Sequence, residues 1–88
     1  MLRELATLYS VILQSATGDP AALIGRLELI TKEGRPWRYS ARETTAVLHL
    51  RTGETAKARD GFAALVDDLS APRNMRARAA EMLRVIDN

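Results

Sequence analysis

The sequence predicts an all-α fold, a short helical solenoid of about five antiparallel helices, and three observations support this. Five segments carry apolar residues at steps of three and four, the spacing that places them on one face of a helix. The connectors between these segments are short, so consecutive helices are expected to pack as antiparallel neighbours. The sequence also lacks alternating runs of β-branched residues and Asn-Gly or Asp-Gly turns, the usual signals of strands and hairpins.

The first two helices are predicted within residues 2–33. In the first, the apolar residues at helical spacing are Leu2, Leu5, Leu8, Tyr9, Ile12, Leu13 and Ala16. Thr17-Gly18 ends this helix and Asp19-Pro20 starts the next. An Asp side chain can accept from free backbone N–H groups, and Pro at the first helical position loses no hydrogen bond. The apolar stripe of the second helix is Leu23, Leu27 and Ile30, with Ile24 beside it.

The third and fourth helices are predicted within residues 36–69. Pro36 restarts the helical pattern with Trp37 just inside it, and the helix runs to about Thr52. Gly53 suits the left-handed residue that closes a helix. The inner stripe of the fourth helix is predicted to be Ala58, Phe62, Leu65, Val66 and Leu69.

A fifth helix is predicted over about residues 71–87, opening at Ala71-Pro72. Its inward residues are Met75, Ala79, Met82, Leu83 and Ile86. With 88 residues in all, the chain has room for a single domain, residues 1–88, and for a thin core. Marginal stability is therefore expected.

The two helix pairs resemble each other in sequence. Thr17-Gly18-Asp19 and Thr52-Gly53-Glu54 are offset by 35 residues (53 − 18). The same offset pairs apolar residues with apolar residues: Leu13 with Leu48, Leu23 with Ala58, Leu27 with Phe62 and Ile30 with Leu65. Two units of about 35 residues, about 2–33 and about 36–69, followed by a capping helix at about 71–87, are the layout of a short solenoid.

The turn and helix around Gly53 resemble a tetratricopeptide repeat. The residues that carry this resemblance are Leu48, Arg51-Thr52-Gly53-Glu54, Ala58 and Phe62. Together with Pro36-Trp37-Arg38, Ser40-Ala41-Arg42-Glu43, Ala71-Pro72 and Arg76-Arg78-Ala79, they resemble the C-terminal part of a bacterial tetratricopeptide-like family. That family includes the ancillary SecYEG translocon subunit, also described as a negative regulator of the RcsB-dependent stress response.

The resemblance implies a non-enzymatic protein–protein interaction module of the cell envelope. Members are typically anchored in the inner membrane by one N-terminal helix, with the repeat domain in the periplasm, and this chain has no apolar run of the ~20 residues that such an anchor needs. In tetratricopeptide repeats the first helix of each pair lines a concave groove. The matching positions, expected to bind a protein partner, are Ser40, Glu43, Val47 and Leu50, with Leu5, Leu8 and Ile12 equivalent in the first repeat.

Composition argues against catalysis. The chain has no Cys and one His, so it offers no thiolate metal site and no triad, and we expect no cofactor and no metal. His49 is expected to pack or to hydrogen-bond within the helices. Trp37 is expected to pin the start of the third helix against the second. The Arg35, Arg38 and Arg42 series is expected to form a mixed-charge surface with Glu33 and Glu43.

Two alternatives remain open. A small nucleic-acid-binding regulator would use Arg73, Arg76, Arg78 and Arg84, but these residues spread around the last helix without a single stripe, and the formal net charge is only +2. A structural dimerisation domain would instead bury the apolar groove against its own copy. The first helix is apolar over more width than one neighbour covers, so we expect homo-oligomers through Leu5, Leu8 and Ile12, most simply a two-fold dimer. In a longer parent protein, further N-terminal helices would sit there.

Overall fold

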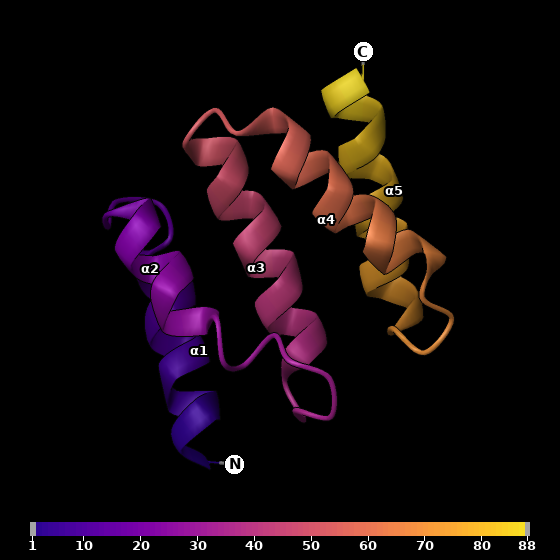
Figure 1. Ribbon diagram of the computed structural model, residues 1–88. Coiled ribbons are helices and arrows are strands. Elements are labelled where there is room, and N and C mark those ends of the chain that lie inside the picture. Colours follow the sequence, from indigo (N-terminus) through magenta and orange to yellow (C-terminus); the bar gives the residue numbers. More distant parts are fainter. Residues whose placement is uncertain (1, 88) are drawn as a thin grey trace.

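The computed structural model describes residues 2–87, which fold into five α-helices with no strand among them (Figure 1). The helices are α1 (Leu2–Gln14), α2 (Pro20–Leu27), α3 (Arg38–Arg51), α4 (Thr55–Asp67) and α5 (Arg73–Asp87). The predicted all-α class and the five helices are therefore confirmed. None of these helices is long and apolar enough to cross a bilayer.

The helices pack in chain order. Each contacts the next, and α1 also contacts α3, so the chain advances from α1 and α2 at one end to α5 at the other (Figure 1). The described residues occupy 36 × 29 × 17 Å, a flattened shape. As a result the apolar core divides into two clusters.

Turn chemistry explains where the helices begin and end. Pro20 occupies the start of α2 after Asp19, whose backbone is extended, but the Asp19 side chain makes no capping hydrogen bond, contrary to expectation. At the end of α3, Gly53 has φ 80°. The N–H of Gly53 donates to the carbonyl of Leu50 (3.0 Å) and the N–H of Glu54 to that of His49 (2.9 Å), so two terminal carbonyls of α3 are satisfied.

The first cluster joins α1, α2 and α3. Its buried side chains are Leu8, Val11, Leu23, Leu27, Ile30, Ala41 and Leu48. Trp37 is half-buried against this cluster, which confirms that it packs where α3 begins. The predicted buried stripe of α2 is also confirmed, although α2 ends at Leu27 and Ile30 lies in the turn that follows.

The second cluster joins α3, α4 and α5. Its buried side chains are Ala46, Ala58, Phe62, Leu65, Met75 and Ala79. All of the predicted inward residues of α5 belong to it or pack against it. The helices α3 and α4 approach closely where Ala46 meets Gly61, because a Cβ atom built on Gly61 would lie 3.1 Å from the Ala46 Cβ.

Two features of the predicted packing are wrong. Leu69 was expected on the inner stripe of the fourth helix, but α4 ends at Asp67 and Leu69 is 82% exposed. In α1 the core-facing side is formed by Leu8 and Val11, whereas Leu13, expected to be equivalent to the buried Leu48, is 83% exposed. The face of α1 that packs against the core is therefore not the face with the most apolar residues, which the sequence pattern predicts to be buried.

Candidate binding groove

A shallow groove lies where α1, α3 and α5 meet. Its volume is ≈ 270 Å³, and it is lined by Ile12 and Ser15 of α1 or the turn after it, by Glu43, Thr44 and Val47 of α3, and by Arg78 of α5. The groove is therefore formed by alternate helices of the chain.

The α3 side of the groove follows from helical spacing. Val47 lies four positions after Glu43 and three after Thr44, so its side chain shares a face of the helix with each of them. Val47 is 40% exposed and Ile12, across the groove on α1, is 42% exposed. Two branched apolar side chains thus remain accessible beside polar ones, a surface that suits an apolar side chain of a ligand with neighbouring polar atoms.

Glu43 and Arg78 form the polar edge of the groove. Arg78 Nε donates to one carboxylate oxygen of Glu43 at 2.9 Å and its terminal nitrogen donates to the other at 3.0 Å, a bidentate pair. This hydrogen bonding raises the pKa of the Arg78 guanidinium above its ordinary value, so Arg78 remains charged. Because Glu43 is on α3 and Arg78 is on α5, the pair ties the last helix to the groove floor.

The predicted partner-binding residues are only partly brought together. Glu43, Val47 and Ile12 line the groove. Ser40 is half-buried at the start of the same α3 face, and its carbonyl accepts from the Thr44 hydroxyl at 2.8 Å. Leu50 does not line the groove, because it packs against the second cluster.

The residues expected to mediate self-association also separate. Leu8 is 3% exposed within the first cluster, so its side chain is part of the core of a single chain and not of an outer surface. Leu5 is half-buried, and only Ile12 of the three is exposed.

Sequence reasoning missed three groove residues, Ser15, Thr44 and Arg78. A signal for Arg78 was available, since it follows Glu43 by the same 35 positions that relate the two helix pairs. That offset also relates Ile12 to Val47 (47 − 12), the two apolar residues of the groove.

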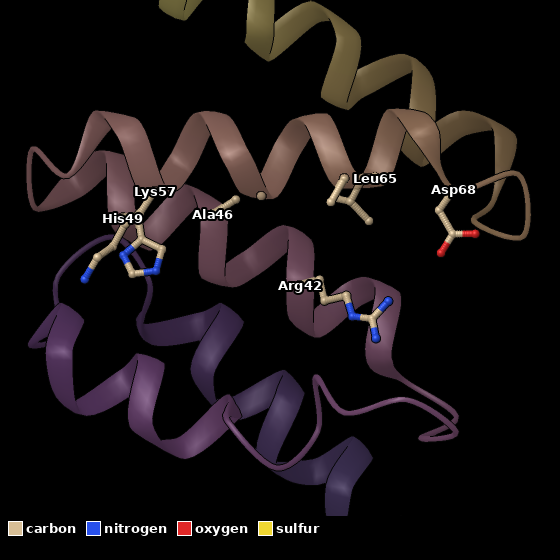
Figure 2. Close-up of a pocket in the computed structure, with 8 residues that line it drawn as sticks. Arg42, Ala46, His49, Lys57, Leu65 and Asp68 are labelled. Carbon is tan, nitrogen blue, oxygen red and sulfur yellow. The ribbon is translucent and has the colours of Figure 1, made fainter.

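A second hollow, of ≈ 250 Å³, runs between α3 and α4 (Figure 2). Small residues form its floor, including Ala46 and Gly61 at the close approach of the two helices. Figure 2 shows His49 and Lys57 at one end and Arg42 toward the other. The polar ends and apolar floor can accommodate a small side chain.

The polar end near His49 is organised by Glu54. The Glu54 carboxylate lies 2.9 Å from Lys57 Nζ and 3.4 Å from His49 Nδ1. Hydrogen bonds from Lys57 first, and then from Thr52, hold the pKa of Glu54 below its usual value. His49 is half-buried at the α3–α4 turn, and its Nδ1 is buried without a hydrogen-bond partner although it lies near the Glu54 carboxylate.

Most arginine side chains form ion pairs or hydrogen bonds with other residues of the same chain. Arg35 pairs with Glu4 at 3.0 Å, and both Arg38 and Arg42 lie within 4 Å of Glu33 (3.6 and 3.5 Å). On α5, Arg76 donates to the carbonyl of Val66, Arg78 is held by Glu43, and Arg84 pairs with Glu81. The expected mixed-charge surface is confirmed for Arg38 and Arg42. Carboxylates thus offset the charges of Arg35, Arg38, Arg42, Arg78 and Arg84, whereas Arg76 contacts a neutral carbonyl.

Among residues 2–87, no group of three or more His, Asp or Glu side chains is placed to hold a metal ion. Comparison of the chain with protein-family models, with curated proteins and with solved structures finds no match.

Proposed function

We propose that this chain is a non-enzymatic, tetratricopeptide-like module that binds a protein partner in the groove between α1, α3 and α5. The proposal rests on which helices supply the residues that line the groove. They come from alternate helices, which is where a helical-repeat solenoid presents its concave surface. The 35-residue relation between Ile12 and Val47, which face the same groove, supports a repeat.

The chemistry of the groove favours a short peptide segment as the ligand. A volume of ≈ 270 Å³ fits one or two side chains, not a folded domain. Ile12 and Val47 would contact an apolar anchor of the peptide. Glu43 and Arg78 would contact its backbone or polar side chains, because both retain surface accessibility (21% and 58% of their side chains).

The resemblance to the bacterial tetratricopeptide-like family suggests a setting for this module. We propose that it serves an envelope protein linked to the secretion translocon or to stress regulation, with membrane attachment supplied outside residues 2–87. The reading frame upstream of Met1 tests this, since an apolar segment of ~20 residues is what an anchor requires.

Selection of binders from a random peptide display library against the whole chain tests the groove. We expect enriched peptides to share an apolar anchor and to lose binding to Val47→Lys. Val85→Lys is the matched control, because Val85 is a valine on α5 that is 68% exposed and does not line the groove. Circular dichroism checks that both variants keep their helices. Peptides that bind Val47→Lys and Val85→Lys equally well would refute the groove as the site.

The nucleic-acid alternative is tested by titrating the chain against random duplex DNA at low salt. A phosphate-binding protein loses affinity by about one log unit per log unit of salt for each phosphate it neutralises. Because Glu43 and Glu81 offset the charges of two of the four arginines of α5, Arg78 and Arg84, we expect no binding at micromolar protein.

A further inference from the structure

An apolar stripe on α1 is largely exposed, and of its residues only Ile12 also lines the groove shared with α3 and α5. Four of its large side chains are exposed, Leu2 by 80%, Tyr9 by 60%, Ile12 by 42% and Leu13 by 83%. Together with the half-buried Leu5 and the exposed Ala6, they form the surface that we call the outer stripe. Leu8 and Val11, on the other side of the helix, are buried in the first cluster, so α1 is apolar on two faces and covered on only one.

The outer stripe differs from the remaining exposed apolar residues. Among residues 2–87, the other large exposed apolar side chains are Leu29, Val47, Leu69 and Val85, which lie on different elements or turns. Isolated exposed residues of this kind are normal on a soluble surface, whereas a contiguous stripe marks an interaction site.

We propose that the outer stripe packs against the same stripe of a second copy of this chain, as an antiparallel pair of α1 helices about a two-fold axis. In an antiparallel pair with the axis midway between Leu2 and Leu13, each Leu2 meets the other copy's Leu13. The same register places each Tyr9 over the other copy's Ala6, a large side chain against a small one. The stripe is thus complementary to itself.

Charge also favours the antiparallel arrangement. The last turn of α1 contains no basic residue of its own, and Arg51 of α3 donates to the carbonyl of Ser15 just beyond it (2.8 Å), so a further cation is favourable at this end. Antiparallel pairing brings Arg3, at the N-terminal end of one copy, beside the C-terminal end of the other. Glu4 does not oppose this pairing, because its carboxylate is turned inward to Arg35 at 3.0 Å and its side chain is 18% exposed.

The area of the outer stripe fits a weak, specific dimer. From their exposed fractions, the four large side chains present roughly 500 Å² per chain, or roughly 1,000 Å² for two copies, which is near the lower limit of specific protein interfaces. We therefore expect a concentration-dependent dimer.

Sedimentation equilibrium of the whole chain over a concentration series provides the first test. We expect the mass to rise from 9.7 kDa toward twice that value at high micromolar concentration, and Leu13→Glu to remain at 9.7 kDa. Leu69→Glu is the matched control and should dimerise like the wild type, since Leu69 is a leucine of equal exposure (82%) outside α1. A wild-type chain that stays at 9.7 kDa, or a Leu13→Glu variant that dimerises normally, would overturn the proposal.

Cross-linking tests the antiparallel register. The sequence has no cysteine, so introduced thiols are the only ones present. A short bis-maleimide linker should join a mixture of Leu2→Cys and Leu13→Cys chains into a heterodimer. Leu13→Cys chains alone should form no cross-linked dimer, because the two thiols of an antiparallel pair would be ~16 Å apart along the helices. Efficient cross-linking of Leu13→Cys alone would show a parallel pair and refute the register. Both tests leave Val47 intact, so they can fail without affecting the peptide-binding proposal.

Discussion

Replacement of Phe62 by Ala tests the second cluster most directly. Phe62 is 0% exposed, and it is the one aromatic residue among the buried members of that cluster, where three of the other five are alanines. Truncation to Ala therefore removes a large part of the apolar volume between α3, α4 and α5. Small neighbours have few atoms with which to refill the space.

The expected cost follows from the size of this side chain. An aromatic side chain buries about 150–250 Å², or about 4–6 kcal/mol at 25 cal/mol per Å², and measured Phe→Ala costs are about 3–5 kcal/mol. Met75 and Met82 are flexible and lie against the same cluster, so their adjustment favours the lower part of that range. A domain of 88 residues has a total stability of roughly 4–13 kcal/mol, so this one substitution removes a large fraction of it.

Thermal and urea unfolding, followed by circular dichroism, measure the effect. We expect Phe62→Ala to lower the thermal midpoint by about 12 °C or more, since 1 kcal/mol corresponds to about 4–8 °C in a domain of this size. Phe62→Leu retains most of the volume and keeps the test measurable if the Ala variant is unfolded. Val85→Ala, at an exposed site, should change stability by less than about 0.5 kcal/mol. A Phe62→Ala midpoint equal to that of wild type would refute the assigned packing.

Two further substitutions test local geometry and charge. Gly25→Ala should raise the free energy of unfolding, measured with urea, by about 0.5–1 kcal/mol, because its new Cβ meets no atom within 4 Å. Gly61→Ala should raise the free energy of unfolding clearly less, because its Cβ would lie 3.1 Å from that of Ala46. Equal gains would show that α3 and α4 have room to separate. Because the pKa of Glu54 is lower in the folded chain than its ordinary value of 4.5, its carboxylate stabilises the fold above pH 4.5, and this contribution is lost as the pH falls through the pKa of the folded state. The difference in thermal midpoint between wild type and Glu54→Gln should therefore shrink on acidification. A difference independent of pH would contradict this linkage.

The C-terminal half of the fold could be predicted from the sequence in some detail. Ala58, Phe62 and Leu65 recur at helical spacing and are all buried, and Met75 and Ala79 are buried as expected. These predictions succeed because α4 has a single apolar stripe, with polar residues on the rest of its surface. That stripe is the part of α4 that packs between α3 and α5. Where one face alone is apolar, periodicity determines the orientation of the helix.

The orientation of α1 could not be predicted in the same way. Its apolar residues surround most of the helix, so the sequence pattern permits several orientations, and the structure buries Val11 while leaving Leu13 83% exposed. The groove was predicted in part for a related reason. The resemblance to a tetratricopeptide repeat identifies Glu43 and Val47, but the pairing of Glu43 with Arg78 depends on how closely α5 approaches α3, which no local pattern specifies.

The two faces of α1 link stability to self-association. Leu8 and Val11 stabilise the single chain, whereas the strongly exposed Leu2 and Leu13 of the outer stripe are buried only when a second copy is present. If the folded chain dimerises and the unfolded chain does not, mass action makes the folded state more stable as protein concentration rises. The thermal midpoint of the wild type should therefore increase with concentration, and that of Leu13→Glu should not. Because Leu13 has almost no contact with the core, its replacement should leave the midpoint at low concentration near the wild-type value. A low midpoint for Leu13→Glu at every concentration would instead assign Leu13 to the packing of the single chain.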